Sequence, residues 1–175
     1  DEGDALIVLT PCFISYKCLV NLCGAKYIDV PMDPENGVQV DVEAIKAAVT
    51  DKTKMLILNN PSNPTGAVFS KENLAEICKL AVERNFLVLA DEIYSRLVYD
   101  EAGYTSITSF EGLADKTVYI SGFSKMFAMT GWRLGYAIAR PDIIRNMTKL
   151  HENGASCLPA PSQLAAAYGL RHCQE

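Results

Sequence analysis

The sequence predicts an α/β fold: a mostly parallel sheet flanked by helices, an α/β/α sandwich. Short apolar runs alternate with segments of helical periodicity along the 175 residues, and this alternation is typical of βαβ units. Three of the apolar runs are followed by unusual polar residues, after Leu58, Ala90 and Ile120. Ligands of such sheets bind beyond the carboxyl ends of the strands, so we expect a binding site there.

Each element follows from a local pattern. Short apolar runs bounded by polar or turn residues predict six strands: residues 5–9, 26–30, 54–58, 86–90, 117–120 and 134–139. Apolar residues three and four positions apart predict five helices: residues 14–23, 42–49, a segment after Ser70, residues 142–151, and a segment from Pro161 toward Leu170. Residues 59–69 and 121–131 show neither pattern and are expected to be loops.

Capping residues mark several helix ends. Asp41 and Ser70 precede helical segments, and their side chains can accept hydrogen bonds from the first free N–H groups. Gly24 follows a helical segment and suits the left-handed conformation found after helices. Pro141 and Pro161 suit the first helical turn.

Composition and charge exclude several classes of protein. The chain has 16 Lys and Arg against 21 Asp and Glu, a net charge of −5, and no basic stripe that would indicate a nucleic-acid partner. Apolar residues make up 49% and charged residues 21%, which excludes disorder as the main state. No apolar run approaches the roughly 18 residues needed to cross a bilayer. We expect a cytoplasmic protein with one domain.

Six cysteines are present, and none forms a C-x-x-C pair. With only two histidines in the chain, we expect no metal site. A disulfide framework is not expected in a domain with a core this large. We expect free, mostly buried thiols in a reducing compartment.

The first motif that can carry chemistry is Asp91-Glu92, which follows the apolar run 86–90. Alone it is similar to the acidic strand end of nucleotide hydrolases, but the glycine-rich G-x-x-x-x-G-K-[ST] loop is absent from the sequence. A second interpretation is a strand that ends in two solvated acids. In a third, Asp91 pairs with a cationic ligand and Tyr94 faces the same ligand, while Glu92 points to the opposite face.

The second motif is residues 59–66, Asn-Asn-Pro-Ser-Asn-Pro-Thr-Gly. Two prolines stiffen this segment, and Asn63 lies between them, where the following proline restricts its backbone. Such residues also make ordinary surface turns. Because eight of them directly follow a buried strand, we favour a binding loop.

The third motif runs from Ser121-Gly122-Phe123-Ser124-Lys125 to the Gly-Trp-Arg-Leu-Gly segment 131–135. One interpretation is a solvated lysine and an arginine paired with a surface acid. The other is an amine that forms a Schiff base, with the Arg133 guanidinium binding phosphate.

Together the three motifs resemble the class I and II aminotransferases, fold type I enzymes that depend on pyridoxal 5′-phosphate. The resemblance covers nearly the whole chain, with the motifs in the family's order and at about its spacing. Residues 127–133 (Phe-Ala-Met-Thr-Gly-Trp-Arg) are similar to the subgroup of bacterial and archaeal aspartate and aromatic aminotransferases. The fold implied is the large domain of these enzymes.

The resemblance implies roles for four residues around the cofactor ring. Lys125 would bind the cofactor covalently and then transfer a proton during the reaction. Asp91 would pair with the pyridine nitrogen. Tyr94 and Asn63 would hydrogen-bond the phenolic oxygen, and we take Lys125, Asp91 and Tyr94 as the catalytic set.

It also implies how the ring face and the phosphate are held. Phe13 would stack on the ring, and Arg133 would bind the phosphate. Gly122 stands where many relatives carry a phosphate-binding serine, and Ser121 or Ser124 would have to replace it.

Family members are roughly twice this length, and the chain begins at Asp1. We therefore expect a fragment: residues 1–175 would form the central part of the cofactor-binding large domain, without the N-terminal segment and the C-terminal small domain. The intact protein would be a homodimer that moves an amino group from an amino acid to a 2-oxo acid, and the isolated chain would be inactive. The alternatives are another reaction of the same cofactor, such as β-elimination, or an inactive structural fragment.

Overall fold

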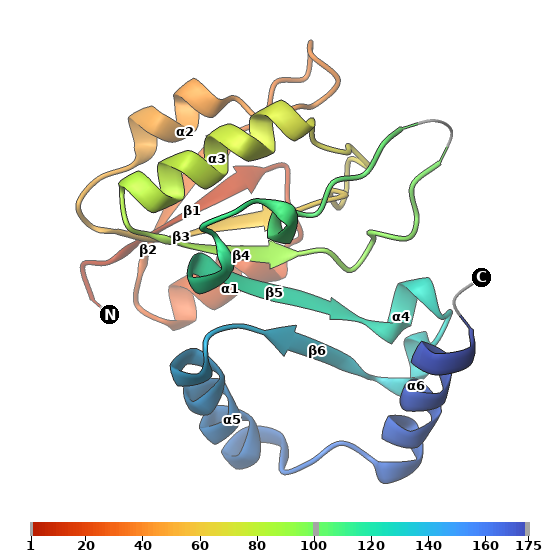
Figure 1. Ribbon diagram of the computed structural model, residues 1–175. Helices are drawn as coiled ribbons and strands as arrows, with labels where there is room; N and C mark the ends of the chain where they lie inside the picture. The colour runs from red at the N-terminus through yellow and green to blue at the C-terminus, as the bar shows by residue number, and fades with distance from the viewer. Residues whose placement is uncertain (1, 100–101, 174–175) are drawn as a thin grey trace.

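A six-stranded sheet forms the centre of the protein in a computed structural model that describes residues 2–99 and 102–173 (Figure 1). In spatial order the strands are β2 (Lys26–Pro31), β1 (Ala5–Thr10), β3 (Thr53–Asn59), β4 (Leu87–Asp91), β5 (Thr117–Gly122) and β6 (Gly135–Ile138). Strands β1 to β5 are parallel to their neighbours, and β6 is antiparallel to β5. The predicted mostly parallel sheet is confirmed.

Helices cover both faces of this sheet (Figure 1). On one face α2 (Val42–Ala48) and α3 (Lys71–Glu83) enclose the larger core cluster, which includes Ile7 of β1. On the other face α1 (Ser15–Leu22) packs over a smaller cluster that includes Val8. Successive β1 side chains therefore enter opposite layers, and the α/β/α sandwich is confirmed.

The remaining helices lie on the β6 side of the sheet (Figure 1): α4 (Phe123–Met126), α5 (Pro141–Ala155) and α6 (Ala160–His172). A small apolar cluster of Phe123, Leu134 and Ala166 joins α4 and α6 to the start of β6. Within the described residues, no helix is both long and apolar enough to span a membrane.

The predicted caps have the expected geometry. Asp41 Oδ1 accepts a hydrogen bond from the Ala44 N–H at 3.0 Å, and Ser70 Oγ accepts one from the Asn73 N–H at 3.1 Å. Gly24 has a φ of +70° and follows Cys23, the C-cap of α1.

The prediction that residues 121–131 form a loop is wrong. Ser121 and Gly122 complete β5, the helix α4 follows, and a 3₁₀ turn spans Thr130–Trp132. Turns this short contain too few residues for helical periodicity to appear in the sequence. Two further 3₁₀ turns, Ile107–Ser109 and Ala114–Lys116, escaped prediction for the same reason.

The expectation that the thiols are mostly buried is also wrong. All six cysteines are free, but Cys78 on α3 is the one that is buried. Cys12 is half-buried, and the other four are exposed: Cys18, Cys23, Cys157 and Cys173.

Candidate functional site

The carboxyl ends of the parallel strands bring the predicted site residues to one edge of the sheet. β1 lies between β2 and β3, so the strand order reverses there, which is where open α/β sheets bind ligands. Because β6 is antiparallel to β5, the beginning of β6 reaches the same edge.

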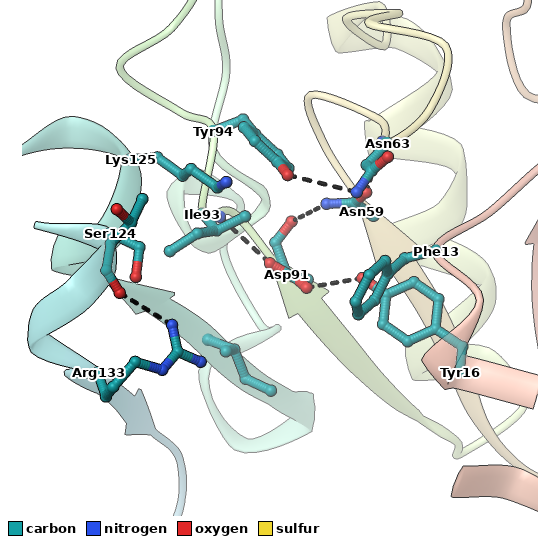
Figure 2. Close-up of a pocket in the computed structure, with 12 residues that line it drawn as sticks. Phe13, Tyr16, Asn59, Asn63, Asp91, Ile93, Tyr94, Ser124, Lys125 and Arg133 are labelled. Atoms are coloured by element: carbon teal, nitrogen blue, oxygen red, sulfur yellow. Dashed lines mark hydrogen bonds between the residues drawn. The ribbon is translucent and has the colours of Figure 1, made fainter. Parts of the chain in front are cut away.

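A cavity of about 480 Å³ opens at this edge (Figure 2). This volume is within the range of small-molecule sites. All seven residues assigned from the sequence line it: Phe13, Asn63, Asp91, Tyr94, Ser124, Lys125 and Arg133. Five further residues complete the lining: Tyr16, Asn59, Ile93, Ile120 and Thr130.

Asp91 ends β4, and its carboxylate is held by two donors (Figure 2). The Tyr16 hydroxyl donates to Oδ2 at 2.6 Å, and the Ile93 N–H donates to Oδ1 at 3.2 Å. A carboxylate has about four lone-pair positions, so further capacity remains for a donor in the cavity.

Glu92 points away from the cavity. It is 2% exposed, and its Oε1 accepts hydrogen bonds from Ser106 Oγ at 3.0 Å and from the Ile107 N–H at 2.9 Å. The interpretation of Asp91-Glu92 as two solvated acids is therefore wrong. Glu92 anchors the segment around residue 106 to the end of β4.

Asn59, the last residue of β3, connects two of the predicted site residues. Its Nδ2 donates to the Asp91 carbonyl at 2.9 Å, and its Oδ1 accepts from the Asn63 N–H at 2.7 Å. The Asn63 side chain in turn donates from Nδ2 to the Tyr94 hydroxyl at 3.3 Å (Figure 2). Since that oxygen accepts from Asn63, its own proton is available for an acceptor in the cavity.

Lys125 projects from α4 into the cavity (Figure 2). Its Nζ lies 5.5 Å from the centroid of the Tyr94 ring, a distance at which an ammonium is attracted to an aromatic face. In the described part of the chain Lys125 makes no ion pair. The amine is thus directed at the cavity without a carboxylate to hold it.

Arg133 is held in a conformation that few residues other than glycine adopt. Its φ of 53° and ψ of 50° are left-handed, an uncommon and strained geometry that clusters at functional sites. Nη1 donates to the Thr130 carbonyl at 3.0 Å, which orients the guanidinium along the cavity wall. Its remaining N–H donors suit an anion with several oxygens.

Gly122 packs too tightly for any other residue. A Cβ atom there would lie 2.9 Å from the Leu134 carbonyl oxygen and 3.0 Å from the Gly135 Cα. The expected serine therefore has no room at this position. Of the two candidate replacements, Ser124 lines the cavity, whereas Ser121 is buried outside the lining.

Phe13 lies just before α1 and covers one side of the cavity (Figure 2). The residue is 42% exposed, and its ring meets the Tyr16 ring edge-to-face, with centroids 5.7 Å apart. The pKa of the Tyr16 phenol is raised above its usual range, mainly by burial and secondly by the negative charge of Asp91. Tyr16 therefore remains a hydrogen-bond donor.

Tyr16 and Asn59 line the cavity but have no role assigned from the sequence. Tyr16 follows Phe13 by three positions, the spacing that places side chains together on a helix. This spacing is the sequence pattern that could have indicated Tyr16 as a neighbour of Phe13. Asn59 follows an apolar run and ends β3, the strand that pairs with the Asp91 strand β4. A buried amide at such a position needs hydrogen-bond partners.

Comparison with known proteins identifies a family to which this chain is similar over its whole length. A family model described as aminotransferase class I and II matches residues 1–175. An aspartate aminotransferase of Pyrococcus abyssi is 44% identical over 170 residues, covering 97% of this chain and 44% of that protein. An aromatic-amino-acid aminotransferase of Thermococcus litoralis is 41% identical over 170 residues, again covering 97% and 44%. The crystal structure of an aromatic aminotransferase from Pyrococcus horikoshii superposes with a TM-score of 0.95 at 43% identity, covering 98% of this chain and 46% of that one. The chain thus spans less than half the length of these relatives.

Proposed function

This chain belongs to the class I and II aminotransferases, and from that premise we propose that the intact protein is a pyridoxal phosphate-dependent aminotransferase. Its substrates would be an amino acid, of the aspartate or aromatic type, and a 2-oxo acid. The observation that carries the proposal is the convergence of an amine, a carboxylate, a phenol and a guanidinium on one cavity that also has an aromatic wall.

The residues present fit this cofactor by their chemistry. The Asp91 carboxylate, which retains a free lone pair, would bind the ring nitrogen. The free hydroxyl proton of Tyr94, oriented by Asn63, would bind the phenolic oxygen. The Phe13 ring would cover the cofactor face.

The phosphate would be held at the opposite wall by Arg133 and Ser124. Arg133 offers a rigid fork of donors to phosphate oxygens. Ser124 lines the cavity and adds a hydroxyl, which position 122 cannot provide because a side chain has no room there.

Pyridoxal phosphate supplies an electron sink that stabilises negative charge at the amino acid Cα. Asp91 would keep the ring nitrogen protonated, because a neighbouring anion favours the charged form of a base. Lys125 would bind the cofactor covalently through Nζ, and the released amine would carry the proton away from the substrate Cα. The Tyr94 ring, whose centroid lies 5.5 Å from Lys125 Nζ, would keep that amine facing the cavity.

We also propose that residues 1–175 are the central part of the cofactor-binding large domain, and that this chain alone does not transaminate. The intact protein would be a homodimer. We propose a cytoplasmic location, which the six free thiols support, because free thiols suit a reducing compartment.

The test uses the intact protein loaded with pyridoxal phosphate and reduced with borohydride. Peptide mapping should find a pyridoxyl group on Lys125 and none in the Lys125→Ala variant. A screen of amino donors with 2-oxoglutarate then identifies the substrate, with Lys149→Ala on α5 as a control that keeps full activity. Modification at Lys149 in place of Lys125, or no turnover with any donor, would refute the proposal.

A further inference from the structure

Tyr16 joins two walls of the cavity that lie far apart in the sequence. It lies in the first turn of α1 and is 7% exposed. Its hydroxyl donates to Asp91 Oδ2, 75 residues away, at 2.6 Å. Both its backbone and its ring contact Phe13: the Tyr16 N–H donates to the Phe13 carbonyl at 3.1 Å, and the two rings meet edge-to-face.

The hydroxyl of Tyr16 is the side-chain donor that fixes the orientation of the Asp91 carboxylate. Within the described residues, the other donor to this carboxylate is the Ile93 N–H, at a longer 3.2 Å. That N–H lies two residues away on the same chain segment and constrains one oxygen. Without the phenol, the carboxylate could turn about its Cβ–Cγ bond.

Short hydrogen bonds to a charged acceptor are the strong ones in proteins. The donor of this bond is also held in place, because Tyr16 is 7% exposed and packs in the apolar cluster between α1 and the sheet. Its geometry is therefore set by the fold and is in place before any ligand arrives.

We propose that Tyr16 is a positioning residue of the cofactor site: its hydroxyl fixes the plane of the Asp91 carboxylate toward the ring nitrogen, while its ring supports the stacking residue Phe13. The inference rests on the proposed function, since the ring nitrogen belongs to the cofactor assigned there. Tyr16 lines the cavity, but its role would be exerted through Asp91 and Phe13.

The experiment compares Tyr16→Phe with Tyr27→Phe in the intact protein. Tyr27 is a matched control, because it packs against the same apolar cluster and its hydroxyl lies 3.9 Å from Cys12 Sγ rather than near Asp91. The apo protein is titrated with pyridoxal phosphate to give a dissociation constant, and the absorption spectrum of the loaded protein is recorded. Tyr16→Phe should weaken cofactor binding by about tenfold, as expected for one hydrogen bond to a charged group, and should shift the visible absorption band. Tyr27→Phe should change neither.

A double-mutant cycle separates positioning from a general effect on stability. If Tyr16 acts through Asp91, Tyr16→Phe should change the dissociation constant by less than about twofold in an Asp91→Asn background. An equal effect in both backgrounds, or equal effects of Tyr16→Phe and Tyr27→Phe, would overturn the inference while leaving the proposed function intact. Failure of the wild-type protein to bind pyridoxal phosphate would overturn both.

Discussion

Replacing Gly122 with alanine tests whether the cavity depends on the close approach of β5 and β6. The added Cβ would lie 2.9 Å from the Leu134 carbonyl oxygen, about 0.5 Å inside the 3.4 Å at which ordinary contact begins. The Gly135 Cα at 3.0 Å blocks relief in the neighbouring direction. Because both obstacles are backbone atoms, rotating a side chain cannot remove them.

The strand β6 must therefore shift, or the strain must remain. Overpacking of this kind costs about 1–3 kcal/mol. Arg133 directly precedes Leu134, so a shift of β6 moves the guanidinium relative to Lys125. A misplacement of about 1 Å can reduce activity by about 100-fold. If β6 shifts by about 0.5 Å to relieve the overlap, we expect kcat/KM to fall by about tenfold.

The assay measures the thermal midpoint, the dissociation constant for pyridoxal phosphate and kcat/KM of the intact protein. Gly131→Ala is the matched control, because a Cβ there meets nothing within 4 Å although the residue lies in the same connection. Gly122→Ala should lower the thermal midpoint and weaken cofactor binding, and Gly131→Ala should do neither. Equal behaviour of the two variants would refute the argument from close approach.

Three further predictions concern the buried residues Glu92, Asn59 and Cys78. Glu92→Ala should lower the free energy of unfolding by about 1–3 kcal/mol, because two donors lose their acceptor, and should weaken cofactor binding far less than Asp91→Ala; equal losses of binding would contradict the structural role of Glu92. Asn59→Ala should weaken cofactor binding, measured by titration, because it releases the main chains of Asp91 and Asn63 together; unchanged binding would refute this. Burial raises the pKa of Cys78 from 9.0 to about 11, so the unfolded chain ionises first and stability should fall as the pH rises from 9 to 11. Thermal midpoints measured across that range should fall less steeply in Cys78→Ala, and parallel curves would contradict the assignment.

Much of the fold was predictable because its signals are local. Apolar runs located all six strands, and caps such as Asp41 and Ser70 located helix starts. The grouping of the candidate site residues was predictable from the motifs, since seven residues named from the sequence line one cavity, and their roles stay predictions. The hydrogen bonds that Tyr16 and Asn59 make to Asp91 were not predictable in this way. Their partners lie 75 and 32 residues away, and only the strand order brings them together.

The direction of β6 was the least predictable feature, and the site depends on it. Parallel strands need a crossover of about a dozen residues or more, whereas antiparallel strands accept shorter connections. Residues 123–134 separate β5 from β6, a length that permits both. The connection contains α4 of four residues and a 3₁₀ turn, too little helix to carry the chain back along the sheet, so β6 pairs antiparallel. Had β6 been parallel, Arg133, which precedes it, would lie at the opposite edge from Lys125. The short helix that escaped prediction is thus what keeps the amine and the guanidinium in one cavity.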